Sequence, residues 1–158
     1  MTNQVKGAIY ENYIEYVFRF LLDIESRSDD EPILISRNVS FVKNGSPNQF
    51  DIYYDFSKAG VLHRVAIECK NHGRPVELSM AREFYAKLSE FHNITGVFVS
   101  NSGYQSGAKS WLEDKEIMAL STSDLPNFFN LIGIRSSNRG ICNTASFRKM
   151  NESAFVLS

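Results

Sequence analysis

Two strand-like runs separated by only four residues constrain the fold of this chain more than any other feature. Residues 49–56 (QFDIYYDF) and 61–70 (VLHRVAIECK) are rich in branched and aromatic residues, and the short segment SKAG joins them. Such a short connection between two strand patterns is typical of a β-hairpin. The centre of the chain therefore predicts two paired antiparallel strands.

Helical and strand patterns alternate through the rest of the chain. We predict helices over about 5–25, 78–91, 106–116 and 123–132, and further strands over 33–42, 94–100 and 117–122. Ser79 is placed to cap the second helix. Strands that alternate with helices indicate parallel crossover units. The predicted fold class is α/β, with a mixed β-sheet core flanked by helices in the order α-β-β-β-α-β-α-β.

The length of 158 residues fits one domain. We place this domain at residues 1–132. Residues 133–158 carry four basic side chains against one acidic one, and we expect a basic C-terminal extension, either an arm or the stub of a longer chain.

Composition excludes several classes of protein. No apolar run approaches the roughly 20 residues of a membrane helix, and the N-terminus lacks the pattern of a signal peptide. We therefore expect a cytoplasmic protein without a membrane partner. Two distant cysteines and three unclustered histidines favour neither a disulfide framework nor a zinc site. With a net charge of −1, nucleic-acid binding would need a local basic surface.

The second strand of the hairpin ends in charged residues, within the segment VAIECKN. Side chains alternate across a strand, so Glu68 and Lys70 point to one face and Ile67 and Cys69 to the other. This alternation places an acid and a lysine side by side at the strand end.

The hairpin register brings a second acid to the same place. If the turn is centred between residues 59 and 60, Asp51 lies opposite Glu68 and Gln49 lies opposite Lys70. Opposed like charges destabilise a sheet, and a divalent cation such as Mg²⁺ would compensate them. Lys70 would orient or deprotonate water, or stabilise a pentavalent phosphorane. The pattern indicates metal-assisted phosphodiester hydrolysis.

An acid-x-Lys triplet alone is a weak signal. A chain of ordinary composition contains about one by chance, and this chain has a second in Glu113-Asp114-Lys115. That triplet lies on a predicted exposed helix, where a solvated surface is the better interpretation. The presence of Asp51 one strand upstream is what favours a catalytic role for Glu68 and Lys70.

The ordered set of these motifs resembles a known family. A helix with GAIYE, a strand with QFDIYYD, a strand with AIECK, and then helix, strand and helix resemble the PD-(D/E)xK restriction-endonuclease-like nucleases. Within them the chain is most similar to Mrr-like (type IV restriction endonuclease) catalytic domains, over about residues 5–125. Phe50 stands where the family name has proline.

The resemblance implies a set of site residues. Asp51 and Glu68 would be metal ligands, together with the backbone carbonyl of Cys69, and Lys70 would be the catalytic lysine. The implied cofactor is Mg²⁺, for which Mn²⁺ would substitute. Glu11 on the first helix would join the metal shell directly or through water.

Several assignments stay open from the residues alone. Glu15, one turn after Glu11, is its rival, and each could equally be a helix-surface acid. Gln49 could contact substrate or the lysine, or lie on the hairpin surface. The remaining substrate-binding candidates are Arg74, Arg82, Tyr104 and Lys109, and Lys87 could line a phosphate-binding surface with the two arginines. Ordinary turn and helix-surface positions are the alternative for all of them.

The function implied is a metal-dependent endonuclease that hydrolyses DNA phosphodiester bonds in prokaryotic defence or DNA processing. The alternatives are a structure-specific nuclease of the Holliday-junction type, an RNA nuclease on the same fold, or a catalytically silent nuclease-like binding module. We expect DNA as partner, and either a homodimer or a targeting domain or partner chain, because no base-reading element is apparent.

Overall fold

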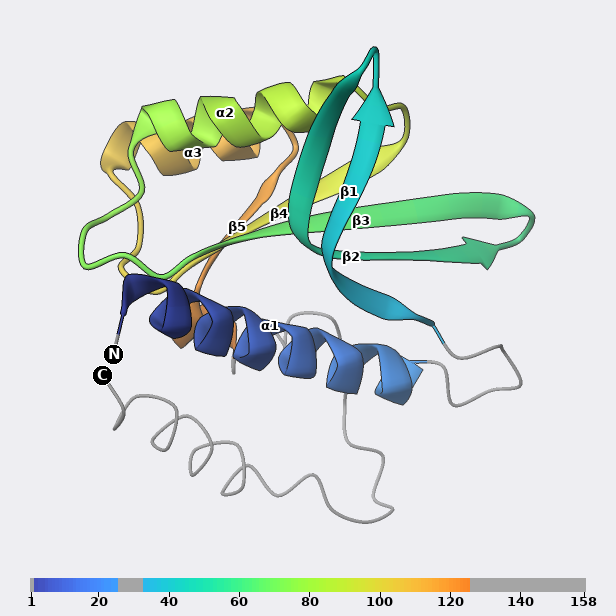
Figure 1. Cartoon of the computed structure of the whole chain (residues 1–158), viewed down its shortest axis with the longest axis horizontal. Coiled ribbons are helices and arrows are strands. Elements are labelled where there is room, and N and C mark those ends of the chain that lie inside the picture. The colour runs from blue at the N-terminus through green and yellow to red at the C-terminus, as the bar shows by residue number, and fades with distance from the viewer. Residues whose placement is uncertain (1, 26–32, 126–158) are drawn as a thin grey trace.

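The computed structural model describes residues 2–25 and 33–125 as an α/β fold (Figure 1). Its elements in chain order are α1 (Asn3–Glu25), β1 (Ile35–Lys43), β2 (Ser46–Lys58), β3 (Val61–Lys70), α2 (Leu78–Ser89), β4 (Ile94–Ser100), α3 (Ser106–Asp114), β5 (Met118–Ser121) and the 3-10 turn η1 (Thr122–Asp124). This order confirms the predicted one. The predicted helix over 123–132, the domain boundary after 132 and the extension over 133–158 lie largely or wholly outside the described residues.

The strands form one mixed sheet in the order β1-β2-β3-β4-β5. β1, β2 and β3 are antiparallel neighbours, whereas β3, β4 and β5 run parallel. The parallel pairs are connected by α2 and α3, as a crossover between parallel strands requires. The predicted mixed sheet flanked by helices is confirmed.

The helices cover both faces of the sheet. In Figure 1, α1 lies along one face, and α2 and α3 lie together on the other. Each face has its own apolar core. The α1-side core includes Ile14, Val17, Ile52 and Ile67, and the α2-side core includes Phe50, Ala66, Phe84, Phe98 and Leu112. None of the helices within residues 2–25 and 33–125 is both long and apolar enough to cross a membrane.

The β2–β3 hairpin has the predicted register. Ile52 pairs with Ile67, which centres the turn between Ala59 and Gly60. These two residues have φ angles of 53° and 77°. Positive φ at both central positions is what a two-residue turn needs to match the twist of the strands.

β1 and β2 bend together at Asn38 and Asp51. Pairing continues in one register on both sides, but Asn38 has a φ of 52°, a conformation that asparagine tolerates better than most residues. Phe50 lies in the α2-side core although Ile52 lies in the α1-side core, so side-chain alternation is broken at Asp51. The part of the β1–β2 pair that contains its turn therefore curves toward α2 (Figure 1).

α2 packs closely on β4 because Gly96 has no side chain. A Cβ atom at this position would overlap Leu88 Cδ1 and would lie 3.3 Å from Phe84 Cε1. The glycine thus lets the last turns of α2 approach the sheet. As a result, the residue next to Leu88, Lys87, reaches the end of β3.

The start of α2 corrects one prediction. The N-cap is Glu77, whose carbonyl accepts the N–H groups of Met80 and Ala81, and not Ser79. An isolated bridge between Val76 and Tyr104 holds the chain extended up to this point, so the helix begins immediately after it. The predicted ends of the elements differ from the observed ones by at most three residues, and those of β3 and β4 are identical.

Candidate active site

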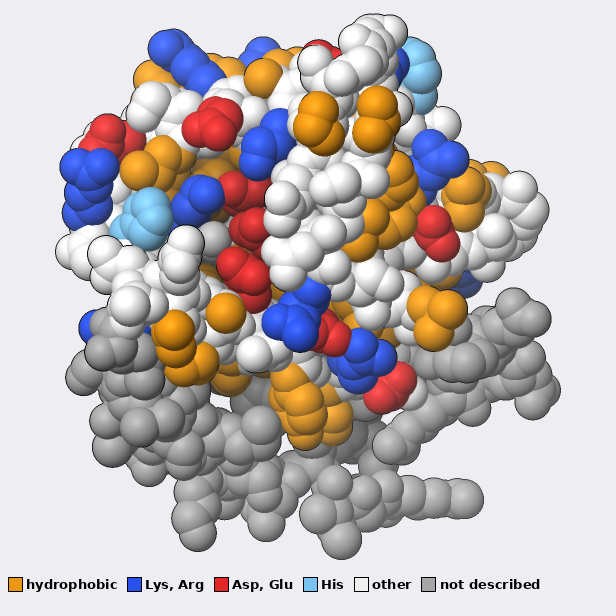
Figure 2. Space-filling model, viewed as in Figure 1, with side chains coloured by type: hydrophobic (Ala, Val, Ile, Leu, Met, Phe, Trp, Pro, Cys, Tyr) orange, Lys and Arg blue, Asp and Glu red, His pale blue; other side chains and the backbone are white. Residues whose placement is uncertain are grey.

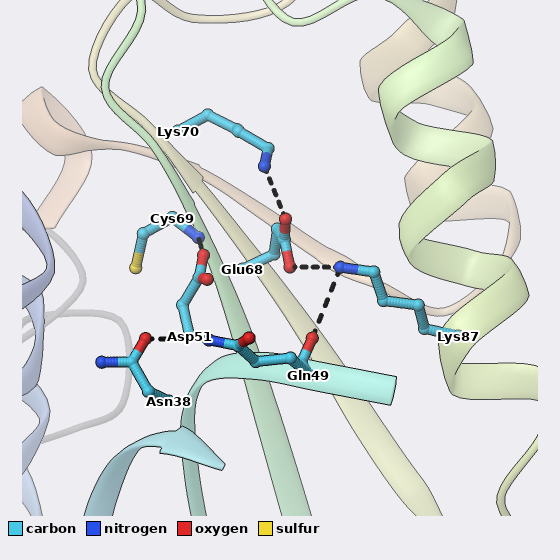
Figure 3. A network of polar contacts seen from close by, with 7 residues as sticks. All are labelled: Asn38, Gln49, Asp51, Glu68, Cys69, Lys70 and Lys87. Carbon is cyan, nitrogen blue, oxygen red and sulfur yellow. Dashed lines mark hydrogen bonds and ion pairs between the residues drawn. The ribbon is translucent and has the colours of Figure 1, made fainter. Parts of the chain in front are cut away.

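Glu68 and Lys70 end β3 on the face of the sheet that α2 covers. Ile67 and Cys69 belong to the α1-side core and Ala66 to the α2-side core, as the predicted alternation requires. Glu68 is only 4% exposed. Lys70 Nζ lies 2.6 Å from Glu68 Oε1 (Figure 3). The acid and the lysine therefore form a close ion pair at the strand end.

The charge of Lys70 is fixed by this pairing. Burial alone would lower the pKa of Lys70, but the neighbouring Glu68 carboxylate outweighs it, and the pKa is raised overall. Lys70 is therefore a protonated ammonium group in this arrangement. It can donate hydrogen bonds and stabilise negative charge.

Asp51 joins the site through the backbone of β3. The pairing of β2 with β3 ends at Ile52 and Ile67, one pair short of the predicted Asp51–Glu68 pair. At this point the Cys69 N–H donates a hydrogen bond of 2.7 Å to Asp51 Oδ2 (Figure 3). The bend of β2 thus replaces a main-chain contact with a side-chain contact that fixes the Asp51 carboxylate beside Glu68.

The two carboxylates repel each other. The pKa of the Asp51 carboxyl is raised to about 6, first by burial and then by the charge of Glu68, while the Cys69 N–H and Lys70 oppose the shift. Holding both groups ionised is therefore unfavourable at this place. A cation placed between them would relieve the repulsion.

Glu11 on α1 takes part in the same electrostatic cluster. Burial raises its pKa, Arg37 lowers it, and Glu68 raises it again. Its rival Glu15 is instead engaged by two arginines, Arg19 and Arg37, the latter with a 2.7 Å contact. Of the two acids, Glu11 has its negative charge less fully balanced by nearby arginines, and it interacts with Glu68. It therefore stays the predicted member of the metal shell.

Figure 2 shows these features at the surface. Acidic side chains gather in the middle of this face, with lysine and arginine side chains around them. Their charges act on one another, because Glu11 and Glu68 both contribute to the raised pKa of Asp51. The site is thus an acidic centre within a basic rim, an arrangement suited to a cation and a polyanionic substrate.

Lys87 on α2 contacts the acidic centre directly, through Glu68, which the sequence does not predict. Its Nζ lies 3.3 Å from Glu68 Oε2 and 3.4 Å from the Gln49 carbonyl oxygen (Figure 3). In the sequence, Lys87 is simply a polar position between the buried Phe84 and Leu88, as on any amphipathic helix. No motif marks it, and only the packing of α2 reveals it.

The Gln49 side chain turns away from Lys70. Its Nε2 donates a hydrogen bond of 3.1 Å to Asn38 Oδ1, across the bend of the β1–β2 pair. Gln49 therefore supports the conformation that presents Asp51. Its predicted contact with substrate stays a prediction.

Three of the other predicted substrate-binding residues contact groups other than the acids of the site. Arg74 forms a contact of 3.4 Å with Glu77, and Arg82 lies over the ring of Trp111 at 6.0 Å. The Tyr104 hydroxyl donates to the carbonyl oxygens of Phe98 and Leu120, so this group joins β4 to β5. Lys109 is exposed on α3. Contacts of these four side chains with substrate stay predictions.

Cys69 offers a backbone group, not a nucleophile. Its thiol is buried, and burial raises the thiol pKa well above its ordinary value, with Asp51 adding to the shift. A protonated, buried thiol does not attack phosphorus. The N–H of Cys69 holds Asp51, and its carbonyl as a metal ligand stays a prediction.

The donor set fits a divalent ion held by few protein ligands. Within the described residues, no group of three or more His, Cys, Asp or Glu side chains is arranged as a complete metal cage. Mg²⁺ usually takes only one or two carboxylates and keeps several waters. Asp51 and Glu68 supply two mutually repelling carboxylates, which meets that need.

Comparison with known proteins identifies the family. The sequence profile of the restriction endonuclease family Mrr_cat matches residues 30–129, more than half of the chain. The chain belongs to this family, and its predicted Mrr-like nuclease fold is confirmed. The domain is therefore an endonuclease domain of the restriction type. No curated protein matches the chain.

Solved structures agree on the fold. A protein of unknown function, AF1548, has a TM-score of 0.53 at 17% identity, over 92% of this chain and 78% of its own. Can2 from Sulfobacillus thermosulfidooxidans, solved in complex with cyclic tetra-adenylate, has a TM-score of 0.59 at 14% identity, over 80% of this chain. This chain spans only 34% of the length of Can2.

Proposed function

We propose that this chain is a Mg²⁺-dependent endonuclease that hydrolyses DNA phosphodiester bonds. One observation carries the proposal: Asp51, Glu68 and Lys70 converge at the point where β2 and β3 separate, with Asp51 held on the backbone between the other two. Two carboxylates and a lysine in this arrangement suit phosphoryl transfer from a phosphodiester to water.

Each side chain has a distinct role in this proposal. Asp51 and Glu68 would hold the divalent ion, with Glu11 binding it directly or through a water. The ion supplies Lewis-acid stabilisation of the scissile phosphate and lowers the pKa of bound water. Lys70, as an ammonium group, orients the attacking water and stabilises the charge that develops on the phosphoryl oxygens. Mn²⁺ would substitute for Mg²⁺.

Target choice would come from elsewhere in the assembly. The described surface offers a basic rim that can bind phosphates of any sequence, and phosphate contacts carry no sequence information. We therefore infer a targeting domain, a partner chain or a second copy of this chain, in a prokaryotic defence or DNA-processing role. One site cuts one strand, so double-strand cleavage would require two copies.

A cleavage assay tests the proposal. Purified protein is incubated with supercoiled plasmid, linear duplex, single-stranded DNA, a four-way junction and RNA, each with Mg²⁺, with Mn²⁺ and with EDTA. We expect nicking or linearisation of duplex DNA in either metal and none in EDTA. Preference for the junction or for RNA would redirect the substrate assignment while retaining the chemistry.

A matched variant excludes a contaminating nuclease. Glu68→Gln keeps the shape of the side chain and one hydrogen-bond acceptor but removes the charge. We expect it to lose cleavage in both metals. Equal cleavage by Glu68→Gln and wild type, or metal binding absent from both by calorimetry, would contradict the proposal and favour a catalytically silent binding module.

A further inference from the structure

Lys87 joins the acidic centre from α2. It lies in the last turn of α2, and its ammonium group contacts both sides of the gap that opens between β2 and β3. On the β3 side it contacts Glu68 Oε2, and on the β2 side the carbonyl of Gln49 (Figure 3). It thus bridges the two strands beyond the end of their hydrogen-bonded pairing.

The Glu68 carboxylate is fully engaged by lysines. Lys70 Nζ is 2.6 Å from one of its oxygens, and Lys87 Nζ is 3.3 Å from the other. The Glu68 side chain is 6% exposed, so water does little to stabilise its charge. Burying a carboxylate to this extent is costly unless positive groups pair with it in this way.

A divalent ion between Asp51 and Glu68 needs one of those same oxygens. Each Glu68 oxygen already faces an ammonium group, and an ammonium group at hydrogen-bond distance would repel a second cation on the same atom. The Lys87 contact is the longer of the two, and charge-assisted pairs weaken with distance. Lys87 is therefore the partner that yields when the ion enters.

We propose, on the basis of the function proposed above, that Lys87 is a resident counter-ion of the active site, which holds Glu68 in place and competes with the divalent ion for it. Lys87 is a positioning residue in this account, since it acts through Glu68. Its strength as a competitor sets the metal concentration at which the site loads.

Calorimetric titration of Mg²⁺ and Mn²⁺ into the full chain without DNA tests this inference. Lys87→Met keeps most of the side-chain volume and removes the charge. We expect it to bind either ion about tenfold more tightly than wild type, which corresponds to the loss of one charge-assisted contact. Lys87→Arg keeps the positive charge and should bind near the wild-type affinity.

Two controls separate competition from general effects. Lys58→Met removes the same charge at the far end of β2, on an exposed lysine, and should leave both dissociation constants unchanged. Thermal unfolding in EDTA and in saturating Mn²⁺ gives a second readout. We expect the metal to raise the melting temperature of Lys87→Met more than that of wild type, because tighter binding stabilises the fold further.

The outcomes are distinct. Lys87→Met binding no more tightly than wild type, while wild type binds and cleaves, would overturn this inference alone. A merely structural role would produce that result, with a lower melting temperature in both conditions. Equal tightening in Lys58→Met would also overturn it, since net charge would then explain the effect. Binding absent from every variant would overturn the proposed function together with the inference.

Discussion

The chain contains the acid-x-Lys triplet twice, and the two copies differ in secondary structure, burial and neighbours. Glu68-Cys69-Lys70 ends a central strand, where the acid is 4% exposed and its lysine lies 2.6 Å away. Glu113-Asp114-Lys115 ends α3, where all three side chains are exposed. The predicted solvated surface at the second triplet is confirmed, and the catalytic role of the first stays a prediction.

The two lysines have different contacts. Lys70 is held by a buried carboxylate, whereas Lys115 lies over the rings of Tyr85 and Trp111, 5.4 Å and 5.8 Å from their centroids. Lys115 therefore packs against aromatic rings and not against an acid of its own triplet. The properties of the first triplet therefore depend on its position at a strand end beside Asp51, and not on its residue types alone.

The sharpest test of this contrast removes each lysine in turn. We expect Lys70→Met to reduce DNA cleavage about a thousandfold, because it removes the cation that would stabilise charge in the transition state. Lys115→Met should cleave as wild type does. Initial rates on plasmid in Mg²⁺ measure both, with circular dichroism to show that each variant is folded.

Retained cleavage by Lys70→Met would also be informative. If Lys70→Met retained cleavage within a few-fold of wild type, the assignment of the catalytic lysine would be wrong. Lys87 would then be the first replacement to examine, since it contacts the same carboxylate from α2.

Much of this architecture could be predicted from local patterns. The four-residue link fixed the hairpin register, and alternation fixed the faces of Ile67, Glu68 and Cys69. Both follow from short-range rules of strands and turns. Element order followed from helical and strand periodicity in the same way, although the N-cap of α2 is Glu77 and not Ser79.

The rest depended on contacts between distant segments. The break of alternation at Asp51 lies opposite the positive φ of Asn38 in a different strand, and asparagine is too common for this conformation to be predicted. Lys87 reaches Glu68 from α2, the helix that packs closely on the sheet at Gly96. Neither arrangement has a signature in a single stretch of sequence.

A second test compares the acids of the two regions through their effect on stability. Asp51→Asn keeps an oxygen that can accept the Cys69 N–H but removes the repulsion by Glu68. We expect the metal-free variant to be more stable than wild type at pH 8 by about 1–3 kcal/mol. The equivalent change Asp114→Asn, on exposed α3, should alter stability by less than about 0.5 kcal/mol.

The pH dependence gives this prediction its sign. The folded-state pKa of Asp51 is about 6, above the ordinary value of 3.8, so the folded chain binds this proton more tightly than the unfolded chain does. The stability that Asp51 contributes is therefore complete below pH 4 and is lost as pH rises through 6. Urea unfolding in EDTA should show the advantage of Asp51→Asn at pH 8 and its disappearance near pH 4. An advantage that is constant with pH would contradict the electrostatic explanation.

The smallest expected effect concerns the aromatic surface beneath Lys115. Lys115→Met removes a cation from the rings of Tyr85 and Trp111 and keeps an apolar chain, so we expect a loss of about 0.5–1 kcal/mol in the free energy of unfolding. Glu113→Gln, in the same triplet, has no such contact and should change stability by less than about 0.5 kcal/mol. Urea unfolding of both variants at one pH measures the difference. If Glu113→Gln cost as much as Lys115→Met, the acid and lysine of the second triplet would act together, and the contrast between the two regions would be one of degree and not of kind.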